Sequence, residues 1–307
     1  MEYSALYSKM LVFFLLICLG YFTAKKGIAT PPFIQSASRM LMDVFIVATV
    51  LNSVLGEKPA VQKDSLLHAI LILTLLTLII YAVSGIVSRI FFRGQENEPQ
   101  VEILLTVVNA LFVGLPIAQA VCGSEGVLYL GMNSIPFFLF LYSYGILRLK
   151  GKTNLSGIAV KEMFSSPPLL AALLALLIFF LDVPVPGVVA EFCAMLASVT
   201  SPLSLMIIGG TIGDLRPGRF LKDWKVWFLC AVRLILTPLI VFLLLSMLPT
   251  EKNLLIVCVI IAATPPGVVC TPLSVQYGYD PEFSSKLIML STLASMITIP
   301  TLIQILF

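Results

Sequence analysis

Long apolar runs follow one another along the chain, separated by short polar or Gly/Pro-rich breaks. A hydrocarbon core about 30 Å thick requires roughly 20 apolar residues for each helical crossing. The pattern therefore predicts an all-α membrane protein with ten transmembrane helices joined by short loops. The predicted spans are 5–24, 33–55, 66–92, 100–121, 126–148, 167–183, 187–212, 225–248, 253–277 and 283–306.

The composition supports a multi-pass membrane protein and leaves little chain for an aqueous domain. Of the 307 residues, 59% are hydrophobic and 11% are charged, whereas about a quarter of residues are charged in soluble proteins. The net charge of +3 comes from residues in loops, so it reports topology and predicts no nucleic-acid partner. The six cysteines are scattered through apolar segments without a CxxC pair, which predicts neither a disulfide framework nor a metal site.

The positive charges predict the orientation of the helices. Fourteen of the 19 lysines and arginines lie in or beside the loops after the first, third, fifth, seventh and ninth spans, and four lie on the opposite side. Because cytoplasmic loops are rich in Lys and Arg, we expect these five loops in the cytoplasm and both termini outside. Lys25 and Lys26 follow the first apolar run, which indicates a retained helix and not a cleaved signal peptide.

The most basic loop divides the chain into two halves, 1–150 and 151–307, with five predicted spans each. This loop lies within "RLKGKTNLSGIAVKEMFSSPP". An odd number of spans per half means that any internal repeat must have inverted topology, as in several transporter folds.

In each half the fourth span contains an unusual interruption. It reads "NALFVGLPIAQ" at 109–119 and "AATPPGVVCTPLS" at 262–274. Proline removes a backbone donor, so a break at membrane depth is tolerated only where it is buried in protein or lines a cavity. Gly/Pro interruptions at corresponding positions of two halves indicate a transporter's binding site, whereas ordinary proline kinks are the alternative.

The interrupted spans predict an anion-binding site. Thr264 suits an N-cap and Pro265 the first position of a new helix, and Pro116 after Gly114 can begin another. If inverted symmetry brings the breaks together, helix N-termini with partial positive charge meet there and attract a carboxylate. The predicted substrate-binding residues are Asn109, Gly114, Pro116, Gln119, Thr264, Pro265, Pro266, Gly267, Thr271 and Pro272.

Four further polar residues inside predicted spans are candidates for a pocket or a proton site. Asp43 lies about ten residues into the second span and either carries a proton or pairs with Arg39. Arg233 either snorkels toward the cytoplasmic face or contacts an anionic substrate or Asp43. Asn52 and Asn133 either face substrate or join helices by hydrogen bonds.

Several sequence segments together resemble the auxin efflux carrier family, which includes bacterial malate-permease-like transporters and plant PIN-type exporters. "NALFVGLP" resembles the family's N-x-x-F-x-G-x-P pattern in helix 4. Other matching segments, in order, are "GYFTAKKGI", "YGILRLKG", "SPLSLMIIGGTI" and "YGYDPEFSSKLIMLSTLASMITIP". The absence of a long central loop favours a prokaryotic protein.

The resemblance implies two inverted five-helix repeats in which helices 4 and 9 are broken and cross. Helices 1, 2, 6 and 7 are then a scaffold, and helices 3–5 and 8–10 a transport domain that moves by an elevator-like mechanism. The family's crossover residues correspond to Asn109, Gly114 and Pro116 and to Pro265 and Gly267. The chain departs from the family in having no proline in helix 2, and in having "VVC" at 268–270 where bacterial relatives often carry Asn.

These observations predict a secondary transporter of small organic anions, such as malate or another dicarboxylate, in the cytoplasmic membrane. Neither interrupted segment contains an acid, so we expect proton coupling or facilitated flow, with no metal and no cofactor. A homodimer is compatible with this prediction. A sodium-coupled symporter of bulkier acids and a channel or sensor remain the alternatives. No HExxH or GxSxG motif supports an enzyme.

Overall fold

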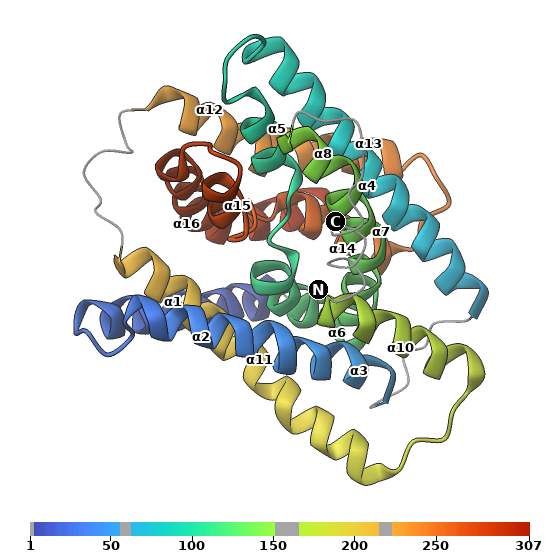
Figure 1. The fold of residues 1–307 in the computed structure, drawn as a ribbon. Helices are drawn as coiled ribbons and strands as arrows, with labels where there is room; N and C mark the ends of the chain where they lie inside the picture. The colour runs from blue at the N-terminus through green and yellow to red at the C-terminus, as the bar shows by residue number, and fades with distance from the viewer. Residues whose placement is uncertain (1–2, 56–62, 151–165, 215–222) are drawn as a thin grey trace. The chain divides into compact units, whose positions relative to one another are not determined.

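The computed structural model describes residues 3–55, 63–150, 166–214 and 223–307 (Figure 1). Within these ranges the chain is helical, and its one β-type pairing is an isolated bridge between Val108 and Pro266. Most of the central basic loop, 151–165, lies outside the described residues, as do Lys58, Arg216, Arg219 and Lys222.

The described helices confirm the prediction of an all-α, multi-pass membrane protein. Six are long and apolar enough to cross a bilayer: Pro31–Leu55, Ser65–Phe91, Ala110–Lys150, Gly187–Gly213, Trp224–Leu245 and Pro281–Leu306. Shorter apolar helices are Leu11–Lys25, Pro167–Leu181 and Lys252–Ala263.

The helices of the first half include three π-helical segments, labelled η. They are α1 (Tyr3–Lys25), α2 (Pro31–Met40), η1 (Leu41–Phe45), α3 (Ile46–Leu55), α4 (Lys63–Phe91), α5 (Glu98–Thr106), η2 (Ala110–Gly114), α6 (Leu115–Met132), α7 (Ser134–Phe140), η3 (Leu141–Gly145) and α8 (Ile146–Lys150).

The helices of the second half include one π-helical segment. They are α10 (Pro167–Leu181), α11 (Gly187–Asp214), α12 (Trp224–Ala231), η4 (Val232–Leu236), α13 (Thr237–Leu245), α14 (Lys252–Ala263), α15 (Cys270–Gln276) and α16 (Pro281–Leu306).

The apolar run from Ala110 to Lys150 is too long for one crossing. Its 41 residues would measure about 60 Å as a straight helix, twice the thickness of a hydrocarbon core. Gly123 interrupts it with φ 62° and ψ −143°, a conformation that favours glycine. The interruption lies between the predicted spans 100–121 and 126–148.

The chain forms two compact units. Unit 1 comprises residues 1–68, 111–134 and 166–217, and unit 2 comprises 69–110, 135–165 and 218–307. Each unit is assembled from segments of both halves of the sequence.

In unit 1, α1 packs along α11 (Figure 1), and glycines lie in the contact. A Cβ atom on Gly20 would collide with the backbone of Met206, and one on Gly209 with the backbone of Ile17. Small residues of this kind let membrane helices approach closely, where van der Waals contact replaces the hydrophobic effect as the main attraction. The absent side chains therefore allow the two backbones to touch.

A polar contact also joins α3 to α11 within unit 1. The hydroxyls of Thr49 and Thr200 lie 2.6 Å apart, and Thr200 donates to the carbonyl of Phe45 at 3.0 Å. Both threonines are buried, so the pair satisfies hydroxyls that have no access to water.

In unit 2, α14 is the central helix. Every residue from Ile256 to Ala263 is at most 1% exposed, which is the pattern of a helix surrounded by protein on all sides. It contacts α13, η4 and α16. The chain that leaves its C-terminus is therefore held deep inside the unit.

Candidate functional site

Two interrupted helices meet in unit 2. α5 ends at Thr106 and α14 at Ala263, and the residues that follow each are extended. Val108 pairs antiparallel with Pro266. Gly267 N–H donates to the Val107 carbonyl at 2.9 Å, and Asn109 N–H donates to the Pro265 carbonyl at 2.9 Å. The two breaks thus satisfy one another's backbone groups where lipid offers no partners.

The residues of the second break explain its conformation. Pro265 and Pro266 have no N–H to continue the helical ladder, and a residue before proline is driven into the extended region. Thr264 accordingly has φ −70° and ψ 150°. A Cβ on Gly267 would lie 2.9 Å from Val107 Cγ1 and 3.3 Å from the Val108 carbonyl oxygen, so glycine permits the close approach.

The structure corrects the predicted helix start at Thr264. This residue is the C-cap of α14, and its hydroxyl donates back to the Ile261 carbonyl at 2.7 Å. No helix begins at Pro265, because the double proline holds the chain extended there, and a turn at 268–269 precedes the start of α15 at Cys270. Thr271 and Pro272 lie in the first turn of α15.

The predicted helix start at Pro116 is confirmed for α6, which begins at Leu115 with Gly114 as its N-cap and Pro116 in its first turn. The π-helical segment η2 precedes it, so helical structure resumes earlier, at Ala110. Gly114 and Pro116 are both buried in unit 1.

Arg233 joins the ends of both interrupted helices. It belongs to η4 and is 0% exposed, so the predicted snorkelling is wrong. Its Nε donates to the Thr264 carbonyl and its Nη1 to the Leu105 carbonyl, each at 2.9 Å. The last carbonyls of a helix lack internal partners and carry partial negative charge. A cation that bonds to two such ends therefore stabilises the crossing.

Two buried donors at the crossing have no acceptor. Arg233 Nη2 and the side-chain Nδ2 of Asn109 are inaccessible and make no hydrogen bond within the described chain. Both residues are anchored to consecutive peptides, since the Arg233 side chain donates to the Thr264 carbonyl and the Asn109 backbone N–H donates to the Pro265 carbonyl. The crossing thus combines a buried positive charge with unused hydrogen-bond donors, which suits an anionic group.

A second polar cluster supports the crossing and was not predicted. Gln100 of α5 is 1% exposed, and its Nε2 donates to Ser274 Oγ at 3.1 Å, to Ser284 Oγ at 2.9 Å and to the Asp280 carbonyl. It therefore connects α5 to α15 and α16. Gln100 is 174 to 184 positions away from Ser274, Asp280 and Ser284, so no local pattern in the sequence would indicate this contact.

A buried carboxylate also escaped prediction. Glu102 of α5 is 0% exposed and accepts hydrogen bonds from Tyr144 Oη at 2.6 Å and Arg148 Nε at 2.7 Å. Arg148 Nη2 also donates to Glu98 Oε1 at 2.6 Å. The sequence feature that could have indicated this cluster is the pair Glu98 and Glu102, which are four residues apart at the start of the predicted span 100–121. This end of the span lies on the same predicted side of the membrane as Arg148.

The remaining predicted residues belong to unit 1. Gln119 is exposed and accepts a hydrogen bond from Ser201 at 3.3 Å. The amide oxygens of Asn52 and Asn133 are buried without a partner in the described chain.

Asp43 lies in the π-helical segment η1 and is exposed. The structure contains no ion pair between Asp43 and Arg39. π-Helical segments inside α-helices are frequent at functional sites, and both charged candidates, Asp43 and Arg233, lie in one. The proton role of Asp43 stays a prediction.

Comparison with known sequences adds two findings. The sequence model of the family described as membrane transport protein matches residues 5–156 and 150–303. An uncharacterized transporter of Methanothermobacter thermautotrophicus is 22% identical over 291 residues, which cover 93% of each chain.

Proposed function

Since this chain belongs to the membrane transport protein family, we propose that it is a secondary transporter of small organic anions in the cytoplasmic membrane. Its resemblance to the auxin efflux carrier family is thereby confirmed, and the family indicates a transporter and not an enzyme. Carboxylates are the proposed substrates, with malate and other dicarboxylates as the first to test. The observation that carries this proposal is the buried Arg233 at the crossing of α5 and α14.

A buried arginine is costly unless its charge is balanced. Arg233 bonds to two neutral carbonyls, and the described part of unit 2 provides no carboxylate within ion-pair distance of it. Charged side chains inside membrane segments commonly mark substrate pathways. A substrate carboxylate has two acceptor oxygens, which would use the free Nη2 of Arg233 and Nδ2 of Asn109.

The two compact units support an elevator-like mechanism. Unit 1 contains the helices that the family resemblance assigns to a scaffold, together with residues 111–134, and unit 2 contains α14 and the crossing. Each unit has a core of its own, which is the requirement for movement as a body. The unit boundary after Ala110 lies one residue beyond Asn109, so the substrate site is proposed to travel with unit 2.

We propose proton coupling or facilitated flow in preference to sodium coupling. The segments 107–109 and 264–269 supply carbonyls, amides and one hydroxyl but no carboxylate, whereas protein sites for hard cations usually include carboxylate oxygens. Asp43 is the proposed proton carrier because it is an acid within a predicted span.

Reconstitution into proteoliposomes tests the proposal. Asn109→Ala removes a buried donor, so we expect initial malate uptake to fall by at least tenfold while purification yield and thermal stability stay near those of the parent. Asn97→Ala is a matched control, because Asn97 precedes α5 and makes no capping hydrogen bond. Uptake in the Asn109 variant equal to that in the control would reject the site.

The same vesicles separate the alternatives. Saturable uptake that follows a pH gradient or the anion gradient supports a secondary transporter. Strict dependence on sodium would contradict the proposed coupling, and fluxes of millions of ions per second would indicate a channel.

A further inference from the structure

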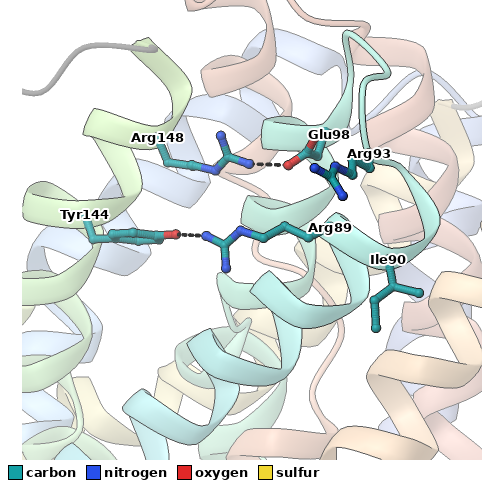
Figure 2. Close-up of a pocket in the computed structure, with 6 residues that line it drawn as sticks. All are labelled: Arg89, Ile90, Arg93, Glu98, Tyr144 and Arg148. Atoms are coloured by element: carbon teal, nitrogen blue, oxygen red, sulfur yellow. Dashed lines mark hydrogen bonds and ion pairs between the residues drawn. The ribbon is translucent and has the colours of Figure 1, made fainter.

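Unit 2 also contains a hollow that is lined by arginines, apart from the crossing of α5 and α14. It has a volume of ≈ 700 Å³ and lies where α4, α5 and α8 come together. Figure 2 shows its side chains, with Tyr144 and Arg148 on one wall and the end of α4 on the other. Its lining residues are Arg89, Ile90, Arg93, Glu98, Tyr144 and Arg148.

Both carboxylates near this hollow form their shortest ion pairs with the same arginine, Arg148. Arg148 donates to Glu98 at 2.6 Å and to Glu102 at 2.7 Å. Arg89 contacts the Tyr144 hydroxyl at 3.1 Å and lies 4.0 Å from the nearest carboxylate oxygen. The hollow thus has three arginines and only two nearby acids, and both acids make their shortest ion pairs with Arg148.

The two remaining arginines are accessible. The side chain of Arg89 is 57% exposed. Arg93 is exposed as well, and its guanidinium makes no ion pair or hydrogen bond to another described residue. Lys225 adds a further positive charge at the neighbouring loop, where its Nζ donates to Gln95 at 3.0 Å. The hollow therefore carries more positive than negative side chains and has two exposed guanidinium groups that an anion could reach.

An apolar stripe on α4 leads to these arginines. Its exposed side chains recur every three or four residues, which places them on one helix face: Leu71, Leu75, Leu78, Ala82, Ile86 and Ile90. Arg89 lies three residues beyond Ile86 on the same helix, and Arg93 follows shortly after α4 ends at Phe91. Ile90 belongs both to the stripe and to the wall of the hollow. The apolar stripe thus ends at cationic side chains, an order that matches the acyl chains and the anionic headgroup of a phospholipid.

We propose that this hollow binds the headgroup of an anionic phospholipid. The phosphate would accept hydrogen bonds from Arg89 and Arg93, whose planar guanidinium groups suit two phosphate oxygens at once. The acyl chains would lie along the leucine and isoleucine stripe of α4. Basic pockets between membrane helices at the predicted cytoplasmic side have the charge and depth for such lipids. This site is independent of the substrate proposal.

Lipid binding by the purified full-length protein tests this inference. Phosphatidylglycerol and phosphatidylcholine with identical acyl chains are titrated into detergent-solubilised protein, and bound lipid is counted by native mass spectrometry. For Arg89→Gln/Arg93→Gln we expect phosphatidylglycerol affinity to fall by roughly tenfold or more, with phosphatidylcholine affinity unchanged. Arg148 is left intact because its loss would leave the buried Glu102 without its arginine.

Two further variants control for charge and folding. Lys25→Gln/Lys26→Gln removes the same charge from exposed residues of unit 1 and should bind phosphatidylglycerol as the parent does. Arg89→Lys/Arg93→Lys should recover part of the lost affinity. Unchanged affinity in the double glutamine variant, or an equal loss in the Lys25/Lys26 variant, would overturn the site.

A last comparison distinguishes a lipid from a free phosphate. Soluble glycerol phosphate has the same charged group but no acyl chains, so it should not displace phosphatidylglycerol at equal concentration. Ile86→Ser/Ile90→Ser should weaken lipid binding because it interrupts the apolar stripe. Displacement by glycerol phosphate, together with full lipid affinity in the serine variant, would show that the hollow is no lipid site.

Discussion

Arg233 is the residue on which both the stability and the chemistry of the crossing depend. It is among the largest fully buried side chains of the described residues, and it bonds to carbonyls that are 31 and 128 positions away in sequence. A positive charge at two helix C-termini is favourable because helix dipoles present their negative ends there. The same guanidinium has one nitrogen, Nη2, that makes no hydrogen bond within the described chain. One side chain thus holds two helices together and leaves a group for substrate.

Replacing Arg233 with Met should separate these two roles. We expect the loss of hydrogen bonds to the Leu105 and Thr264 carbonyls to lower the free energy of unfolding by about 1–3 kcal/mol, since buried acceptors lose their partners. Malate uptake and any rise of Tm caused by malate should disappear. Thermal unfolding with and without malate measures both effects, with Arg39→Met as a control at an exposed arginine. A malate-dependent rise of Tm that survives in the Arg233 variant would contradict its role in binding.

At the scale of elements, the contact between α1 and α11 depends on the absence of side chains. Gly20 and Gly209 lie where the two backbones touch. A methyl group at either position would meet backbone atoms, which cannot move aside as a flexible side chain can. Membrane helices gain their association energy from such close contact.

Gly209→Ala should therefore force α1 and α11 apart. We expect the free energy of unfolding to fall by about 1–3 kcal/mol, the usual cost of inserting atoms into a packed site. Gly187→Ala adds the same methyl group to α11 where nothing lies within 4 Å, so it should leave Tm nearly unchanged. Thermal unfolding in one detergent compares the pair. Equal Tm values for both variants would show that the close contact between α1 and α11 does not contribute to stability.

For the whole molecule, the distribution of charge predicts the orientation in the membrane. The ends of α4 and α8 carry Arg89 and Arg148, and both arginines contact Tyr144 or Glu102 at one end of unit 2. The predicted third and fifth spans therefore finish at the same end, as alternating crossings require. The excess of positive charge at this end supports its assignment to the cytoplasm.

Labelling of single cysteines tests this orientation. In a variant without its six native cysteines, Lys26→Cys should be protected from a membrane-impermeant maleimide in intact cells, and Lys252→Cys should react. Both lysines are exposed in the structure, so the difference reports the side of the membrane and not burial. Permeabilised cells should label both. Reaction of Lys26→Cys in intact cells would reverse the predicted topology.

Helical content, membrane insertion and the location of the two breaks followed from the sequence alone. Apolar runs of about 20 residues and the missing N–H of Pro265 and Pro266 are local properties, so they can be read without knowing what lies nearby. The predicted helix start at Thr264 was wrong because the point at which a helix resumes depends on which partners satisfy the intervening backbone.

The tertiary structure alone decided which groups meet. Asn109 N–H reaches the Pro265 carbonyl, Arg233 joins Leu105 to Thr264, and Gln100 connects α5 to α15 and α16. These contacts join residues distant in sequence, and no periodicity encodes them. The prediction that Arg233 snorkels to the surface was wrong because the carbonyls at two helix ends accept hydrogen bonds from its guanidinium inside the protein. Hydrophobicity thus determined that the chain enters the membrane, and hydrogen bonding between distant segments determined the arrangement of its candidate site.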